Sequence, residues 1–126
     1  MDLKQYFDTT KRFGVLATAS SDGQVDIAVY ARPHVVDEET VVFIMADRLS
    51  HKNLQSNPHA AYLFRKGAAR YVGKRLHLTK VKEETDPEKI EELRRHKTPI
   101  ACEPEEGKVR YLVTFRVDRV RPLIGD

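Results

Sequence analysis

The chain has 126 residues, of which 40% are hydrophobic and 33% are charged, and its formal net charge is +3. This composition is typical of one globular domain, residues 1–126, with a single core, and it argues against a disordered or fibrous protein. No apolar run approaches the roughly 18 residues of a membrane-spanning helix, and residues 1–7 lack the pattern of a signal peptide. We therefore expect a cytoplasmic protein, in which the single cysteine, Cys102, forms no internal disulfide.

Apolar residues recur with a period of two along most of the chain, which predicts short strands. Turn residues at Ser21–Gln24 join the first two strands into a hairpin, and Arg32–Pro33 interrupts the second because proline has no backbone donor. Three helices are expected near residues 2–10, 50–56 and 85–95. The expected strands cover residues 13–20, 25–31 (resumed at 34–36), 40–45, 60–64, 71–82 and 108–117.

About six short strands with helices only at the periphery predict a mainly β protein. The expected architecture is a closed or nearly closed, Greek-key-like antiparallel barrel. Internal repeats and low-complexity segments are absent from the sequence, so every segment is expected to belong to this one barrel.

The passage from the apolar strand at 41–45 into the helix at 50–56 is the most informative local pattern. The first amides of a helix have no partner within it and carry partial positive charge, so they stabilise an anion. Ser50, His51 and Lys52 stand at this helix start. The pattern therefore predicts a pocket for a phosphate monoester.

Basic residues are concentrated between Arg65 and Lys82, a stretch without any acidic residue, and an acidic block follows at 83–92. A nucleic-acid-binding barrel with Tyr71 and His77 as stacking surfaces is therefore an alternative interpretation. It is disfavoured because Tyr71 is the only large aromatic side chain in the stretch. The five histidines of the chain are too scattered for a zinc motif, so no metal is expected.

Four segments, in this order, resemble the flavin-binding split β-barrel of the pyridoxamine 5'-phosphate oxidase-like superfamily. They are Gly14–Thr18 in the first strand, Val25–Pro33 in the second, Ser50–Pro58 at the helix and Ala60–Phe64 in the strand that follows. The resemblance spans most of the chain. It implies a homodimer with two molecules of flavin mononucleotide (FMN) at the subunit interface, each touching both protomers.

The resemblance also implies which residues contact the flavin ring. Arg32 takes the place of an arginine that opens a strand beside the cofactor, and the backbone of Pro33–Val35 is expected along the ring. Ile44–Met45 matches a strand end that flanks the cofactor, and Arg75 corresponds loosely to a polar residue that reaches the ring.

For the phosphate, the resemblance implies Ser50, His51 and Lys52, with Arg48 as a further ligand and Asn53 as a polar support. The chain is about one residue shorter than the oxidases in this region, so the choice between His51 and Lys52 stays open. The complete set of expected cofactor contacts is Arg32, Pro33, His34, Val35, Ile44, Met45, Arg48, Ser50, His51, Lys52, Asn53 and Arg75.

The chain departs from the oxidases at its carboxyl end, where Pro122–Asp126 stands in place of their longer, substrate-binding extension. We therefore expect an FMN-dependent oxidoreductase acting on an unidentified small molecule, and not a true pyridoxamine phosphate oxidase. A flavin-binding or redox-sensing module without turnover is an alternative. A deazaflavin-dependent reductase is another, in which basic residues between Arg65 and Arg75 receive the cofactor's acidic tail.

Overall fold

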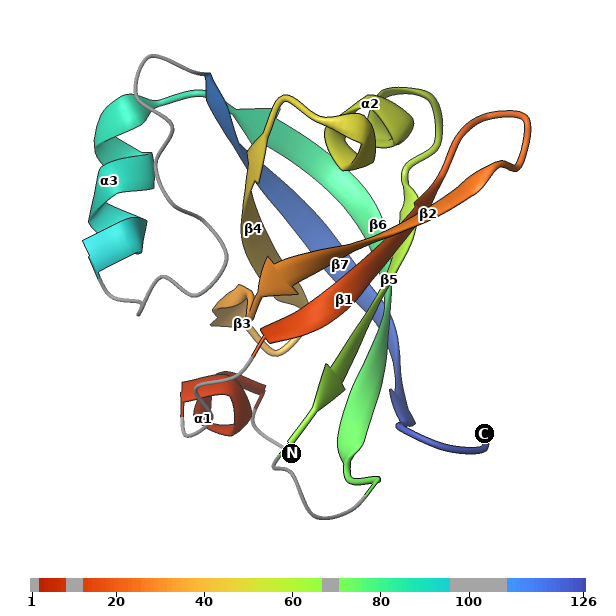
Figure 1. Cartoon of the computed structure of the whole chain (residues 1–126). Coiled ribbons are helices and arrows are strands. Elements are labelled where there is room, and N and C mark those ends of the chain that lie inside the picture. The colour runs from red at the N-terminus through yellow and green to blue at the C-terminus, as the bar shows by residue number, and fades with distance from the viewer. Residues whose placement is uncertain (1–2, 9–12, 67–70, 96–108) are drawn as a thin grey trace.

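The computed structural model describes residues 3–8, 13–66, 71–95 and 109–126. Within these residues it contains seven strands and three helices (Figure 1). In chain order they are α1 (Leu3–Asp8), β1 (Phe13–Ala19), β2 (Val25–Ala31), β3 (His34–Asp37), β4 (Thr40–Ala46), α2 (Leu49–Ser56), β5 (His59–Arg65), β6 (Gly73–Glu84), α3 (Pro87–Arg95) and β7 (Arg110–Pro122).

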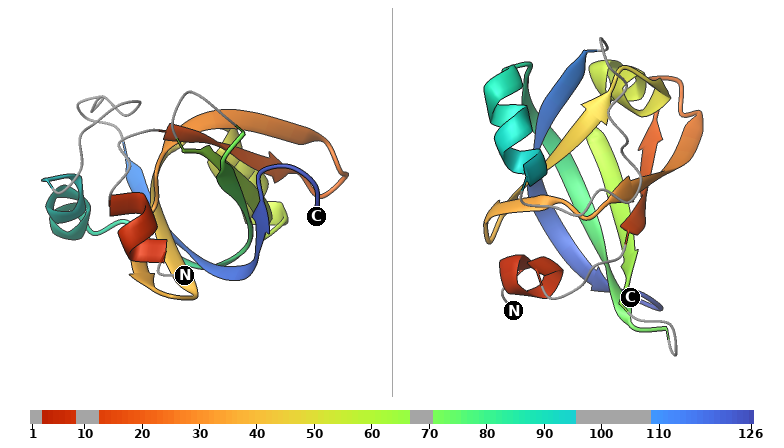
Figure 2. Two further views of the ribbon diagram at one scale, coloured as in Figure 1. Left: turned by 90° about the horizontal axis from the view of Figure 1, so that it is seen from below. Right: turned by 60° about the vertical axis from the view of Figure 1, so that its left-hand side comes forward.

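The strands form one antiparallel sheet in the order β2-β1-β5-β6-β7-β4-β3, which curls around the core into a barrel (Figure 2). The two edge strands, β2 and β3, follow one another in the chain and are joined by Arg32–Pro33. Proline cannot donate to a strand ladder, so hydrogen bonding ends here. The result is a seam between β2 and β3, and the predicted barrel is confirmed as a split one.

Alternate residues of the strands fill the interior of the barrel. Tyr62, Phe64 and Phe115 are fully buried, and the Phe43 ring lies 5.0 Å from that of Tyr62 and 5.8 Å from that of Phe115. The Tyr62 hydroxyl donates to the carbonyl oxygen of Tyr30 at 3.1 Å, which satisfies the one polar atom of its ring. Each such buried side chain stabilises the fold by about 1.5–3 kcal/mol.

A second, smaller core lies outside the barrel, where α3 covers the outer face of β4 and β7 (Figure 1). Ile90 of α3 packs with Val42 and Leu112, and Ile44 and Leu93 border them. Because of this cover, β4 and β7 bury side chains on both faces, whereas the strands β2, β1 and β5 leave their outer face open.

The structure extends the sequence-based expectations in two places. There are seven strands rather than about six, because the segment at 34–37 forms its own pairs with β4 across the break. The last strand continues from the expected end at Val117 to Pro122, with a register shift between His77 and Leu78 of the partner strand β6. Cys102 lies outside the described residues. No helix in the described part of the chain is long and apolar enough to cross a membrane.

Candidate functional site

The helix α2 lies across one end of the barrel and begins directly after β4 (Figure 1). Its N-cap residue, Arg48, is extended, with φ −131° and ψ −171°, and provides no side-chain cap to the helix. The first bond within the helix runs from the amide of Lys52 to the carbonyl oxygen of Arg48, at 3.0 Å. The amides of the first turn are therefore not capped by the residue that usually does so.

One face of α2 is buried against the barrel. Ser50, His51, Asn53 and Leu54 make up this face, and the Asn53 side-chain amide donates to the Thr18 hydroxyl at 3.0 Å. Since Asn53 fixes the helix to β1 through a buried hydrogen bond, its role in the structure is to position α2. The buried face thus holds two of the expected phosphate ligands, Ser50 and His51, and the expected polar support, Asn53.

His51 is the most constrained residue of this face. Its ring stacks on Tyr111 with the centroids 3.8 Å apart and the planes 14° apart. Its Nε2 lies 3.0 Å from a carboxylate oxygen of Glu83, and its Nδ1 lies 3.6 Å from Asp47. Gln55, one turn later, lies within hydrogen-bond distance of both the ring and Glu83. We call His51, Asp47, Gln55, Glu83 and Tyr111 the histidine cluster.

Glu83 is the anionic centre of the histidine cluster. Partial burial raises its pKa, but hydrogen bonds from Gln55, Lys80 and His51 outweigh that effect and lower the pKa to about 2. The Lys80 ammonium lies 2.5 Å from the carboxylate. Glu83 is therefore ionised in the folded protein and links β6 to the buried face of α2.

The opposite side of α2 carries two exposed cations, Arg48 and Lys52, spaced by four residues. Residues four apart lie on the same side of a helix, so both lie beside the uncapped first turn. Among the described residues, the Lys52 ammonium has no hydrogen-bond or ion-pair partner. His51 and Lys52, between which the sequence left the choice of phosphate ligand open, thus differ in position: His51 is buried and Lys52 is exposed.

The residues expected along a flavin ring lie at the seam and in the neighbouring strand. Arg32 and His34 are half-buried, and Pro33 is buried. The charge of Arg32 acts on Tyr62, whose pKa is nevertheless raised because the hydroxyl is buried. His34 pairs with Val42 of β4, four residues before the end of that strand. The seam thus lies roughly 13 Å along β4 from the end of that strand, which precedes α2.

The remaining expected contacts lie apart from the start of α2. Met45 is fully buried in the barrel core, and Ile44 borders the small core beneath α3. Arg75 lies on the outer face of β6. The residue of β6 that pairs with the start of β5, just after α2, is Thr79, and Arg75 lies four residues before it. Its Nε donates to the carbonyl oxygen of Pro122 at 2.8 Å. Arg75 is therefore not brought together with α2 of its own chain.

Sequence reasoning missed the histidine cluster, although part of its signal was present. Asp47, His51 and Gln55 recur every four residues, so they share one side of a helix. Glu83 and Tyr111 come from distant strands, and only the fold places them there. Within the described residues, no group of three or more histidine, cysteine or carboxylate side chains is arranged to hold a metal ion.

Solved structures share this fold at low sequence identity. An F420 reductase aligns with a TM-score of 0.73 at 18% identity, over 93% of this chain and 94% of that one. An FMN-binding protein from Syntrophomonas wolfei aligns with a TM-score of 0.71 at 14% identity, over 98% and 90% of the two chains. A candidate pyridoxamine 5'-phosphate oxidase from Lactobacillus delbrueckii aligns with a TM-score of 0.65 at 14% identity, over 94% and 90%.

The chain therefore has the split-barrel fold of the pyridoxamine 5'-phosphate oxidase-like proteins. At identities this low, the likeness concerns the fold and not the activity. No protein-family model matches the sequence, and no curated protein is significantly similar to it.

Proposed function

We propose that the chain binds FMN and acts as a flavin-dependent oxidoreductase on a small molecule. The observation that carries the proposal is the exposed start of α2, where an uncapped first turn lies beside Arg48 and Lys52. Helix amides and flanking cations together form a favourable environment for a phosphate. Two structural relatives with this fold, an FMN-binding protein and an F420 reductase, support a flavin-type cofactor.

The residues at this end of the molecule fit an elongated, phosphate-bearing ligand. Lys52 and Arg48 would hold the phosphate, and the backbone of Pro33–Val35 at the seam would lie along the ring. Ser50, His51 and Asn53 support the helix from its buried face. Bound flavin supplies the electron transfer itself, so the protein needs to contribute orientation and charge, not an acid or base of its own.

A homodimer belongs to the same proposal. The outer face of β2, β1 and β5 is apolar and has no cover among the described residues, and we call it the apolar face. The exposed fractions of Val25, Ile27, Val29 and Leu63 are 81%, 69%, 50% and 41%. A contiguous exposed apolar surface of this kind favours association, and a second copy would bury it.

The phosphate assignment is tested by titrating the protein with FMN and following the flavin fluorescence. Lys52→Ala should weaken binding by about tenfold or more, because a charge-assisted hydrogen bond contributes about 1.5–3 kcal/mol. Lys82→Ala is the matched control, since Lys82 is an exposed lysine of β6 outside this site. Equal affinity of Lys52→Ala and wild type would refute the assignment.

The deazaflavin cofactor F420 is the second candidate ligand. It is favoured by the structural likeness to an F420 reductase and by the basic side chains of β6, which suit an acidic tail. A competition titration separates the two ligands, because the preferred ligand should displace the other one. The affinity for that ligand should fall in Lys52→Ala. A flavin-binding module without turnover shares the same site and is separated by assaying substrate-dependent flavin reduction.

A further inference from the structure

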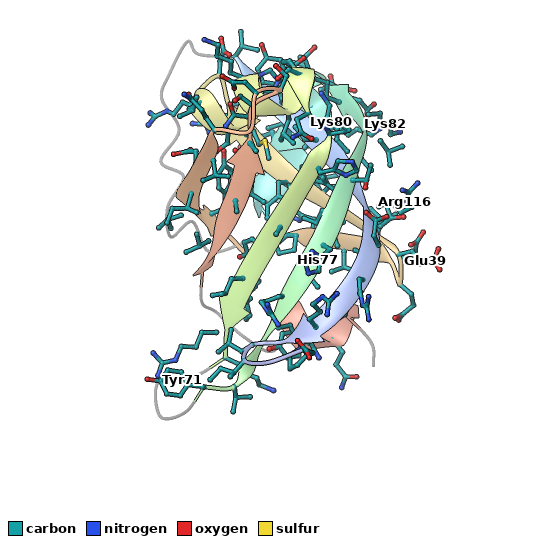
Figure 3. All side chains as sticks on the ribbon, turned by 90° about the vertical axis from the view of Figure 1, so that its right-hand side faces the viewer. Glu39, Tyr71, His77, Lys80, Lys82 and Arg116 are labelled. Atoms are coloured by element: carbon teal, nitrogen blue, oxygen red, sulfur yellow. The ribbon has the colours of Figure 1, made fainter. Side chains whose placement is uncertain are left out.

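The outer face of the sheet changes from apolar to basic along its rows of paired residues. One row runs from β2 to β7 through Val29, Val15, Leu63, Arg75 and Arg121. The next row, two residues along each strand, runs through Ile27, Ala17, Ala61, His77 and Arg119. Figure 3 faces the β5–β6–β7 side, with His77 near its middle. We call Arg75, His77, Arg119 and Arg121 the basic ladder.

The basic ladder places two arginines directly opposite one another and a third in the adjacent row. Arg75 pairs in register with Arg121, and His77 pairs with Arg119. Like charges directly opposite in a sheet destabilise it, so such pairs are usually avoided. No aspartate or glutamate side chain of the described residues lies within ion-pair distance of the three arginines. The charge of this surface is therefore not compensated by a carboxylate side chain in the described part of the chain.

The neighbouring cations of the same two strands differ in this respect. Lys80 pairs with Glu83, Lys82 lies 3.8 Å from Glu84, and Arg116 donates to Asp118 at 2.7 Å. These three cations are thus each paired with a carboxylate side chain, unlike the three arginines of the ladder. Because neighbouring strands lie about 4.8 Å apart and alternate residues about 7 Å apart, the ladder covers a compact surface and not a long track.

The donors of the ladder are only partly used. Arg75 donates to the carbonyl oxygen atoms of Pro122 and Gly125, and Arg121 donates to His77 and to the backbone oxygen of Asp126. These contacts show that oxygen acceptors fit against the ladder. Each guanidinium has five N–H donors, so most of them, and all those of Arg119, have no protein acceptor among the described residues.

His77 adds one more donor. Arg121 Nε donates to its Nε2 at 3.1 Å, so Nε2 carries a lone pair and the ring proton is on Nδ1. An N–H group of His77 is therefore left to donate elsewhere on the same surface.

We propose that the basic ladder is a binding site for a compact polyanionic group of a small molecule, of the diphosphate class. Each guanidinium group can bind two phosphate oxygen atoms at once, so three neighbouring arginines suit a diphosphate better than three lysines would. The ladder lies on the outer face of β6 and β7, away from α2. The ladder is therefore separate from the proposed phosphate site at α2 of its own chain.

A nucleic acid is the less favoured partner for this surface. Strand binding needs a continuous basic groove with aromatic side chains on which bases stack. Beyond the two rows, the cations of β6 and β7 named above are paired with carboxylates. The exposed Tyr71 lies just before β6, at the end of the sheet opposite Lys80 and Lys82 (Figure 3). The surface therefore lacks both the length and the stacking platform.

Calorimetric titration of the intact protein with pyrophosphate at low ionic strength tests the site. Arg119→Gln should lower the affinity by about tenfold, because it removes one charged donor from the ladder. Arg116→Gln is the matched control, an exposed arginine of the same strand that is already paired with Asp118. Failure of the wild-type protein to bind pyrophosphate, or an equal loss in the control variant, would overturn the proposal.

Two further measurements keep the outcome specific. Without ligand, Arg119→Gln should raise the melting temperature by about 1–4 °C because it removes repulsion from the arginines of the next row, Arg75 and Arg121, whereas a purely structural arginine would lower it. Pyrophosphate affinity should survive in Lys52→Ala, which separates this site from the one at α2. Tighter binding of a single-stranded oligonucleotide than of pyrophosphate, lost in Arg119→Gln, would replace the proposal with a nucleic-acid surface.

Discussion

His51 joins α2 to the barrel through three different kinds of contact. It stacks on Tyr111, donates a hydrogen bond to the Glu83 carboxylate, and lies within reach of Asp47. A helix of eight residues has little stability of its own, so α2 depends on such tertiary contacts for its position. The proposed phosphate site is built on this helix, and His51 therefore acts on the site through the backbone.

Replacing His51 tests this role. His51→Ala should lower the free energy of unfolding by about 2–4 kcal/mol, because it leaves a cavity beside Tyr111 and deprives Glu83 of a partner. Lys52→Ala, the adjacent exposed residue, should change it by less than about 0.5 kcal/mol. Urea denaturation measures both, and equal losses in the two variants would show that His51 does not anchor the helix.

The low pKa of Glu83 predicts how stability depends on pH. Its folded-state pKa of about 2 lies below the ordinary value of 4.5, so the unfolded chain binds the proton first as the pH falls. The stabilisation is fully present above about pH 4.5 and is lost as the pH falls toward 2. Since Glu83 is 25% exposed, we expect its share of that loss to be about 1–3 kcal/mol.

Glu83→Gln provides the comparison for this pH dependence. The variant should be less stable than wild type at pH 7 and should lose less stability between pH 4.5 and pH 2.5. Urea denaturation across this range measures the two slopes. Parallel curves for the variant and wild type would mean that another carboxylate carries the effect.

At the scale of elements, periodicity identified most strands but not their extent. The bounds of β1 and β2 were predicted within one residue, because turn-forming residues mark the end of β1 and the start of β2. The end of β7 was not, since the alternation of apolar residues stops at Val117 while the strand continues through Asp118, Arg119 and Arg121. Arg119 and Arg121 of the basic ladder lie in this extension, which is why sequence reasoning did not find it.

The close approach of β1 to β5 is another property that the periodicity of the sequence does not predict. A Cβ atom at Gly14 would lie 2.3 Å from the carbonyl oxygen of Leu63 and 2.6 Å from the Tyr62 ring. Gly14→Ala should therefore destabilise the fold by about 2–4 kcal/mol, because the backbone of β5 cannot move aside without breaking its hydrogen bonds to β1. Thermal unfolding measures this, with Ser21→Ala in the exposed turn as a nearly neutral control. A melting temperature equal to wild type would contradict the close approach.

At the scale of the whole molecule, the open outer face distinguishes the two halves of the barrel. The half formed by β4 and β7 is covered by α3, whereas the apolar face on β2, β1 and β5 is exposed. The same alternation that fills the barrel thus also places apolar residues outside, where only association would bury them. The sequence alone does not distinguish these outward residues from core residues, because both follow the same period.

Disruption of the apolar face tests the proposed dimer. Ile27→Glu should convert a dimer into a monomer, because it places a charge in the middle of the surface that a second copy would cover. Val36→Glu is the control, since Val36 is also exposed, at 63%, but lies on β3. Sedimentation velocity measures the mass, and a wild-type monomer, or a dimer that survives Ile27→Glu, would exclude this interface.

The resemblance of four short segments was sufficient to predict the split barrel, and the structural relatives confirm that fold. The expected site was predicted only as a region. Sequence placed Ser50, His51 and Lys52 at one helix start, but which of them faces solvent depends on how α2 rotates against Thr18 and Glu83. That rotation is a tertiary property, and it leaves Lys52 and Arg48 as the exposed pair.

The central claim is that this barrel binds FMN, and the most direct test is the visible absorption spectrum of the purified protein. The protein is mixed with FMN, and unbound ligand is removed on a sizing column before the spectrum is recorded. We predict flavin absorption that co-elutes with the protein at about one flavin per chain and is reduced in Lys52→Ala. Protein that elutes without flavin absorption, at FMN concentrations well above micromolar, would contradict the account.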